Sequence, residues 1–176
     1  NHGAEVILVS GPVGLKPPNK VNLYNVNTAD EMLEISLKCL PMDIAVFVAA
    51  VADWKVEKPY SGKIKKKKDS MTLNFERNPD ILKYIANHRM RPNLVVGFSA
   101  ETEKIEENSR KKLIQKGCDW ILGNIVGKKT GVFGSEKNQI FFISEKSIEK
   151  WPKLYKSEVA VKLLEKVRNH FKNYND

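Results

Sequence analysis

Short apolar runs alternate with helical patterns along this chain, and that alternation constrains the fold more than any other feature of the sequence. The runs lack the polar alternation of a half-exposed strand, so they are typical of strands that are buried on both faces of a sheet. The predicted strands of this kind lie at Glu5–Ser10, Ile44–Ala49, Leu94–Phe98 and Trp120–Gly123.

Helical patterns fill the intervals between the apolar runs. Thr28 and Glu31 have the spacing of a capping box. Asn78 is placed to cap a second helix with Pro79 in its first turn, and Gly117 is placed to end a third. The predicted helices are Thr28–Leu40, Pro79–His88 and Glu103–Lys116. Alternating strands and helices predict right-handed crossovers, and therefore a Rossmann-like three-layer α/β fold with a mostly parallel central sheet.

Segments outside this pattern predict a small β-rich arm or margin and a closing helix. Met71–Glu76 and Gln139–Ile143 are rich in strand-forming residues at an expected mixed or antiparallel edge, where a dimer contact could form. Tyr155–Phe171 places its apolar residues on one stripe and should cover the sheet. With 176 residues, of which 41% are hydrophobic, the sequence fits one compact domain over residues 1–176.

The net charge of +9 indicates a surface that attracts anions, which include polyphosphates, nucleic acids and acidic lipids. Charge alone does not choose among them, and the lysine run at Lys63–Lys68 is equally typical of a solvated face. No run has the roughly 18 to 20 apolar residues of a membrane span, and the start lacks a signal-peptide pattern. We therefore expect a cytoplasmic protein without a membrane partner, in which Cys39 and Cys118 are reduced core residues.

The segment FVAAVADW, at Phe47–Trp54, is the first candidate for a ligand site. It is a predicted strand that ends in small residues and then an acid, at the edge where an α/β sheet binds its ligands. Ala49 and Ala50 leave room for a ring or a ribose. Asp53 could accept hydrogen bonds from a ribose or a base, or help to hold a metal, or it could simply cap the next turn.

Lysines and a helix start supply candidate phosphate ligands. Lys63 lies in a glycine-bearing loop that could fold onto phosphates, although a solvated loop or a nucleic-acid contact gives the same pattern. Asn78–Ile81 opens a helix whose backbone N–H groups could bind an anion. Lys112 and Lys116 share a helix face, where they repel unless a triphosphate lies between them; an ordinary solvated helix is the alternative. Phe98 could stack on a nucleobase or belong to the core.

Six motifs, in this order, resemble those of the bacterial phosphopantothenoylcysteine synthetase domain, and the resemblance covers essentially the whole chain. They are LVSGP at Leu8–Pro12, NTADEM at Asn27–Met32, AAVADW at Ala49–Trp54, GKIKK at Gly62–Lys66, NPDIL at Asn78–Leu82 and GFSAET at Gly97–Thr102. The lysine pair and Gly123-Asn124 then follow at compatible spacing.

The resemblance implies which residues surround the bound nucleotide. Lys63 would be the catalytic residue, on a flap over the reacting phosphates. Lys112 and Lys116 would hold the β and γ phosphates, and Asp53 would contact the cytidine or orient the metal. No residue is assigned as a metal ligand. The other family positions around the nucleotide are Phe47, Val48, Ala49, Pro79, Asp80, Ile81, Leu82 and Phe98.

The resemblance also implies the reaction. Family members use CTP with Mg²⁺ to activate the carboxylate of 4'-phosphopantothenate as an acyl-cytidylate, with release of pyrophosphate. The amine of L-cysteine then displaces CMP to give 4'-phosphopantothenoyl-L-cysteine, in coenzyme A biosynthesis. The expected partners are a second copy of the chain, in a homodimer, and a flavin-dependent phosphopantothenoylcysteine decarboxylase, fused or paired; nucleic acid is not expected.

The chain departs from the family pattern at its start. The family's first strand, most of its first helix and an asparagine associated with the acyl-cytidylate precede the point at which this sequence opens, so no catalytic asparagine is assigned. Two other functions fit parts of the pattern. A Rossmann-type nicotinamide or flavin enzyme fits the alternation, although no GxGxxG follows a predicted strand. A basic nucleic-acid-binding module fits the charge, although aromatic residues do not interleave with the lysines.

Overall fold

The structure is a computed structural model that describes residues 3–60, 62–63, 70–126 and 137–172. The chain divides into two compact units, which we describe one at a time. The first unit comprises residues 1–42 and 49–91, and the second comprises residues 43–48 and 92–176. Within the described residues, no helix is long and apolar enough to cross a membrane.

The first unit begins with a pair of parallel strands, β1 (Ile7–Ser10) and β2 (Asn22–Asn25). Helix α1 (Ala29–Lys38) follows and packs on β1 and on α2 (Ile81–Ala86). The predicted capping box is confirmed, because Thr28 Oγ1 accepts a hydrogen bond from the backbone N–H of Glu31 at 3.1 Å.

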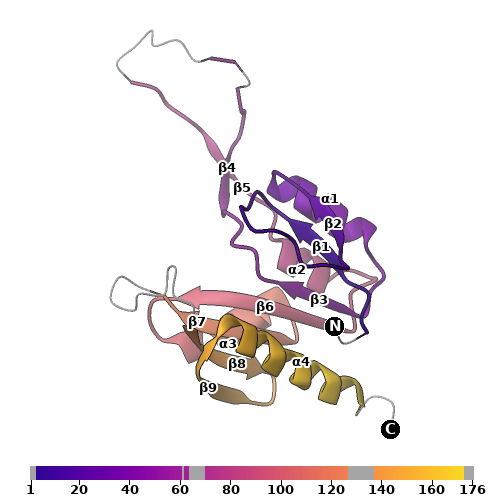
Figure 1. Cartoon of the computed structure of the whole chain (residues 1–176). Coiled ribbons are helices and arrows are strands. Elements are labelled where there is room, and N and C mark those ends of the chain that lie inside the picture. The colour runs from indigo at the N-terminus through magenta and orange to yellow at the C-terminus, as the bar shows by residue number, and fades with distance from the viewer. Residues whose placement is uncertain (1–2, 61, 64–69, 127–136, 173–176) are drawn as a thin grey trace. The chain divides into compact units, whose positions relative to one another are not determined.

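An arm extends from the helices of the first unit (Figure 1). Its described stem is an antiparallel pair, β4 (Trp54–Val56) and β5 (Phe75–Arg77). Lys55 ties this stem to α1, because its Nζ atom lies 2.5 Å from Asp30 Oδ2. The hydrogen bond to Asp30 raises the pKa of Lys55 above its ordinary value. The β-rich arm predicted around Met71–Glu76 is therefore present, with its strand starting at Phe75.

The second unit is built on a five-stranded sheet in the order β3-β6-β7-β8-β9. Strands β3, β6 and β7 are parallel, and β8 and β9 continue the sheet in antiparallel pairs. The strands are β3 (Ile44–Phe47), β6 (Leu94–Glu101), β7 (Trp120–Ile125), β8 (Lys137–Ser144) and β9 (Ile148–Tyr155). The predicted α/β class, with parallel central strands and an antiparallel margin, is confirmed.

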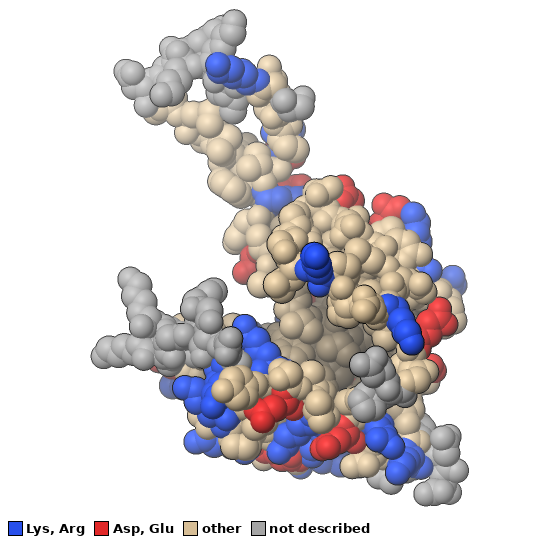
Figure 2. All heavy atoms as spheres, in the orientation of Figure 1, with Lys and Arg blue, Asp and Glu red and all other residues tan. Residues whose placement is uncertain are grey.

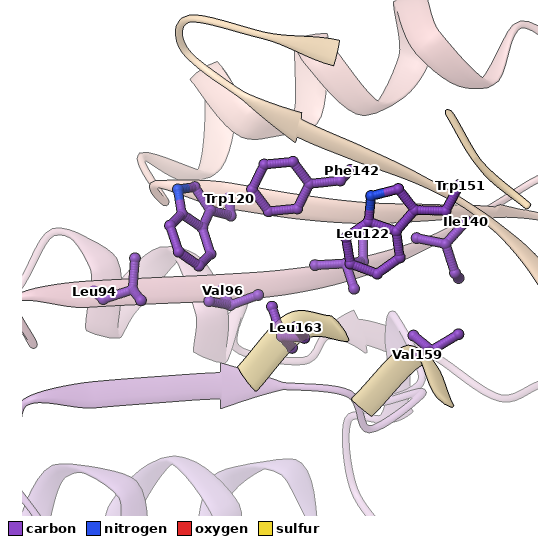
Figure 3. Packing of buried hydrophobic residues seen from close by; sticks show 9 residues of the cluster. All are labelled: Leu94, Val96, Trp120, Leu122, Ile140, Phe142, Trp151, Val159 and Leu163. Carbon is purple, nitrogen blue, oxygen red and sulfur yellow. The ribbon is translucent and has the colours of Figure 1, made fainter. Parts of the chain in front are cut away.

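Helix α4 (Lys156–Lys172) covers one face of this sheet, as predicted for the last helix, through Val159 and Leu163. Figure 3 shows these side chains against a layer of aromatic and aliphatic residues from β6 to β9. The Phe142 ring stacks on the Trp151 ring at 5.8 Å between centroids and meets the Trp120 ring edge-on at 5.2 Å. Such pairs add to the stability supplied by burial of apolar area.

Helix α3 (Ile105–Lys116) packs on β6, β7 and β8 through Ile105, Ser109 and Leu113, which are buried. Gly117 ends the helix with a φ of 72° and donates its N–H to the Leu113 carbonyl oxygen, as the sequence predicts.

The structure corrects several predicted boundaries and pairings. The run predicted at Glu5–Ser10 as a buried strand of the central sheet forms β1 in a separate pair with β2, and Val6 is 43% exposed. The helix predicted at Pro79–His88 spans Ile81–Ala86 only. Asn78 does not cap it, because the Asp80 side chain accepts the N–H of Lys83 at 3.1 Å.

Candidate functional site

Asn78 joins two candidate segments of the first unit. Its backbone N–H donates to the Asp53 carbonyl oxygen at 2.9 Å, and its side-chain Nδ2 donates to the Ala52 carbonyl oxygen at 2.8 Å. The segment before β4 that carries Ala52 and Asp53 is therefore held beside the helix start that carries Pro79–Leu82. Both segments were predicted as ligand positions, and the structure brings them together.

Some side chains of these two segments are exposed to solvent, and others are packed in the interior. Asp53 and Asp80 are exposed, and Ala49 is exposed as well, so all three are accessible to a ligand. Ile81, in contrast, is only 5% exposed, and its side chain packs in the interior of the first unit. Leu82 is half-buried. Ile81 thus has a packing role that the sequence motif alone does not reveal.

Lys63 lies in the arm, beyond β4, and is exposed. A Cβ atom on the preceding residue, Gly62, would lie 2.8 Å from Cε1 of Tyr60, whose side chain is exposed and can move aside. The remaining residues of the predicted GKIKK motif, 64–66, lie outside the described residues, as does most of the lysine run. The structure thus shows the accessibility of Lys63.

In the second unit, Phe47 ends β3 directly opposite Gly97 of β6. Val48 follows and is 61% exposed. Phe98 packs against the apolar cluster under α4, on the same face of β6 as Leu94 and Val96. Of the two roles considered for Phe98, the structure shows the core contact.

Strand β6 and helix α3 are joined by two polar contacts on the opposite face of the sheet. Ser99 and Ser109 share a hydrogen bond of 3.0 Å between their hydroxyl oxygens. Two residues further along β6, Glu101 Oε1 lies 2.7 Å from Nζ of Lys112. Residues 109, 112 and 116 recur at intervals of three and four, so Lys112 and Lys116 extend the face that Ser109 anchors.

Gly123 of β7 allows α3 to lie this close to the sheet. A Cβ atom at this position would be 2.5 Å from Ser109 Oγ and 3.1 Å from Ile105 Cγ1. A larger residue would push the helix outward, and the lysines with it. Gly123 of the Gly123-Asn124 motif therefore has a direct structural reason, because its missing side chain allows the close approach of α3 to β7.

Glu101 is the residue of this site that sequence reasoning missed. For Lys112 and Lys116, the sequence indicated either a bound triphosphate or an ordinary solvated helix face. The structure instead supplies a carboxylate of the chain itself, and Glu101 is only 8% exposed. Its signal in the sequence was an acid at the end of an apolar strand, shortly before a lysine-bearing helix.

The remaining electrostatic features are compatible with anion binding but do not locate it. On the face drawn in Figure 2, basic and acidic side chains are interspersed over the second unit. Among the described residues, no group of three or more His, Cys, Asp or Glu residues could hold a metal ion. Burial raises the pKa of the Cys39 thiol, which makes it a poorer nucleophile at neutral pH.

Residues 1–171 match the family described as DNA/pantothenate metabolism flavoprotein C-terminal domain. The coenzyme A biosynthesis bifunctional protein CoaBC of Borreliella burgdorferi is 34% identical over 165 residues, which are 92% of this chain and 41% of that protein. A cysteine/cysteine sulfinic acid decarboxylase from an unknown prokaryotic organism is 35% identical over 168 residues, or 94% of this chain and 47% of that protein.

Among solved structures, the C-terminal domain of a coenzyme A biosynthesis bifunctional protein CoaBC is similar to this chain with a TM-score of 0.78 and 31% sequence identity. The match covers 97% of this chain and 76% of that one. The chain thus spans less than half the length of the curated relatives cited above, while it spans most of a single solved domain.

Fold and site together define a Rossmann-like α/β domain whose lysine-bearing helix α3 packs on β6, β7 and β8 and contacts the end of β6 through Lys112. The chain belongs to the family of DNA/pantothenate metabolism flavoprotein C-terminal domains. The family resemblance carried by the six sequence motifs is thereby confirmed.

Proposed function

We propose that this chain is a CTP-dependent phosphopantothenate–cysteine ligase domain of coenzyme A biosynthesis. The observation that carries the proposal is its match, over 97% of its length, to a solved CoaBC C-terminal domain at 31% identity. The order of the six motifs supports the same activity, because it resembles that of the phosphopantothenoylcysteine synthetase domain.

The proposed reaction has two steps. A carboxylate oxygen of 4'-phosphopantothenate attacks the α-phosphorus of CTP, and the bond to pyrophosphate breaks. The amine of L-cysteine then attacks the acyl carbon, CMP leaves, and the amine nitrogen loses a proton. Since a free carboxylate is a poor acyl donor, the nucleotide supplies the activation, and the protein contributes mainly positioning and electrostatic stabilisation.

Lysines have the main electrostatic roles in this proposal. Lys112 and Lys116 hold the β and γ phosphates from the face of α3 that Ser109 anchors. Lys63 covers the reacting phosphates from the arm, and its exposure is compatible with this role. An ammonium group on a flexible stem suits a charge that changes position during a reaction.

The nucleoside and the metal involve the remaining predicted residues. Asp53 contacts the cytidine or orients Mg²⁺, and its exposed carboxylate is accessible for either role. Sites for Mg²⁺ on nucleotides commonly use one or two carboxylates and the phosphates themselves, so a cluster of three protein ligands is not required. The proposed positions around the nucleotide are Phe47, Val48, Ala49, Pro79, Asp80 and Leu82, while Ile81 and Phe98 pack against buried residues and would support these positions from there.

The proposed partners are a second copy of the chain and a flavin-dependent decarboxylase. The CoaBC relatives are named as bifunctional proteins, which supports a fused or paired decarboxylase. A cytoplasmic location is proposed with them, because the pathway's substrates are small and polar. One relative is itself named as a cysteine/cysteine sulfinic acid decarboxylase, so the assay must separate ligation from decarboxylation.

The test is a turnover assay on the intact protein that contains this chain. We expect pyrophosphate and CMP to form in equal amounts when 4'-phosphopantothenate, L-cysteine, CTP and Mg²⁺ are all present, with CTP preferred over ATP. Lys112→Ala and Lys116→Ala should each raise the KM for CTP. Lys111→Ala is the matched control, because Lys111 lies on the same helix but pairs with Glu107 at 2.6 Å on its exposed side.

Other products would contradict the ligase. Release of CO₂ from cysteine without CMP would identify a decarboxylase. Reduction of a nicotinamide or flavin would favour the Rossmann-type redox alternative. Binding to nucleic acid that falls steeply with salt and shows no CTP preference would favour the nucleic-acid module.

A further inference from the structure

Glu101 is a buried carboxylate to which the proposed reaction assigns no role. Its side chain is only 10% exposed, at the carboxyl end of β6. Removing a carboxylate from water is costly unless a partner compensates its charge. The opposite charge in contact with it is the ammonium of Lys112, at 2.7 Å.

The contact is an ion pair rather than an aligned hydrogen bond. Among the described residues, Glu101 Oε1 accepts no hydrogen bond, although the Lys112 ammonium touches it. An ammonium group has three N–H donors, so its contact with Oε1 leaves donors for a further acceptor. The side chain of Lys112 is 40% exposed, so a second acceptor can reach these donors from solvent.

The location of the pair is fixed by the fold. Ser99 and Glu101 lie on one face of β6, because side chains alternate along a strand. Ser109 and Lys112 lie on the facing side of α3. The buried Ser99–Ser109 hydrogen bond therefore aligns the two elements, and the ion pair follows as the next contact toward the end of the strand.

We propose that Glu101 is a positioning residue, which holds the Lys112 ammonium at the end of β6 in the orientation that receives the phosphates of the nucleotide. This inference rests on the proposed function. A lysine side chain has many rotamers, and fixing it before the ligand arrives removes that entropic cost from binding. The Glu101 carboxylate also repels a phosphate. Removing it therefore measures whether the positioning of Lys112 or the repulsion of the phosphate has the larger effect on CTP binding.

Glu101→Gln tests the proposal, because the amide keeps the shape and removes the charge. We expect the KM for CTP to rise about tenfold, with little change in kcat, since a lysine loses side-chain entropy worth about that factor. In a Lys112→Ala background, Glu101→Gln should cause no further increase. Glu107→Gln is the matched control, because Glu107 pairs with Lys111 on the exposed side of the same helix.

Either of two results would overturn the proposal. Tighter CTP binding by Glu101→Gln would show that the carboxylate competes with the phosphates. An equal increase in KM with and without Lys112 would show that Glu101 supports the fold and does not act through the lysine.

A measurement without nucleotide separates this inference from the proposed function. Reductive ¹³C-methylation labels lysine side chains, and the Lys112 signal is assigned by its loss in Lys112→Arg. In the nucleotide-free protein, Glu101→Gln should move this signal toward that of an exposed lysine, and an unchanged signal would refute the pairing. If wild type makes no product with CTP while the signal still moves, the ligase proposal fails and the pairing stands.

Discussion

The hydroxyl groups of Ser99 and Ser109 lie 3.0 Å apart, so β6 and α3 share a buried hydrogen bond. Ser99 is 6% exposed and Ser109 is fully buried. Each hydroxyl supplies the hydrogen-bond partner of the other, beside the buried apolar side chains of Ile105 and Leu113. The bond lies one helical turn before Lys112, and it therefore links the packing of the second unit to the candidate phosphate-binding face.

The Ser99–Ser109 hydrogen bond predicts that the loss of stability depends on whether one hydroxyl or both are removed. Ser109→Ala leaves the Ser99 hydroxyl buried without its partner and should lower the free energy of unfolding by about 1–3 kcal/mol. Replacing both residues by alanine should cost less than the sum of the two single changes, because no hydroxyl then stays unpaired. Urea unfolding measures these differences. Additive costs would contradict the importance of the pair.

The close approach of Ser109 to Gly123 predicts that a side chain at position 123 displaces α3. Gly123→Ala places a methyl group 2.5 Å from Ser109 Oγ, so the helix must shift, and we expect a loss of about 1–3 kcal/mol in the free energy of unfolding. The KM for CTP should rise as well, because Lys112 moves with α3. Gly14→Ala is the control, since a Cβ atom there would have no atom within 4 Å.

A double variant sharpens the test at Gly123. Ser109→Ala removes the atom that clashes, so it should make Gly123→Ala less costly than it is in wild type. If Gly123→Ala costs the same in both backgrounds, the close approach of Ser109 does not explain the glycine.

The hydrogen bonds of Asn78 predict that its substitution weakens CTP binding at the nucleoside end of the proposed site. Asn78→Ala removes the side-chain hydrogen bond to the Ala52 carbonyl oxygen and should cost about 1 kcal/mol in stability. The KM for CTP should increase, because Asp53 and Asp80 then lose their fixed separation. Asn87→Ala serves as a control for amide removal, since Asn87 lies at the other end of α2. An unchanged KM in Asn78→Ala would refute this role of the link.

Local signals were sufficient for much of the fold. Thr28 with Glu31, and Gly117, mark helix ends by hydrogen bonds to neighbours in the sequence, and the structure confirms them. The uniformly apolar runs in β6 and β7 gave correct strands. Strand β9 was missed, because Lys150, Lys153 and Pro152 interrupt its apolar residues, although an edge strand tolerates the proline.

The candidate site was harder to predict from the sequence. It depends on contacts between residues on different elements, which the spacing of motifs does not reveal. Glu101 and Lys112 are eleven positions apart, and their contact arises only after α3 folds back on β6. The face of Phe98, in contrast, could have been predicted. It continues the alternation of Leu94 and Val96, which places all three on one side of the strand.

The pair formed by Glu149 and Lys166 predicts a pH-dependent contribution to stability. The hydrogen bond from Lys166 lowers the pKa of Glu149 below its ordinary value of 4.5, against an opposing effect of burial. In the unfolded chain the carboxyl returns to its ordinary pKa. The pair therefore stabilises the fold above that value, and its contribution is lost as the pH falls through the lower, folded-state pKa.

Glu149→Gln isolates this contribution. The variant should be less stable than wild type at about pH 7, by up to about 1 kcal/mol because both side chains are about one-third exposed. The difference in free energy of unfolding should shrink as the pH is lowered toward about 3. Urea midpoints across this range measure it. Lys166→Met should reduce the pH dependence of the difference, and the remainder comes from Trp151 and Lys162, which also lower the Glu149 pKa. If the difference grows on acidification instead, the Glu149 pKa lies above its ordinary value in the folded protein, and the sign of the argument is wrong.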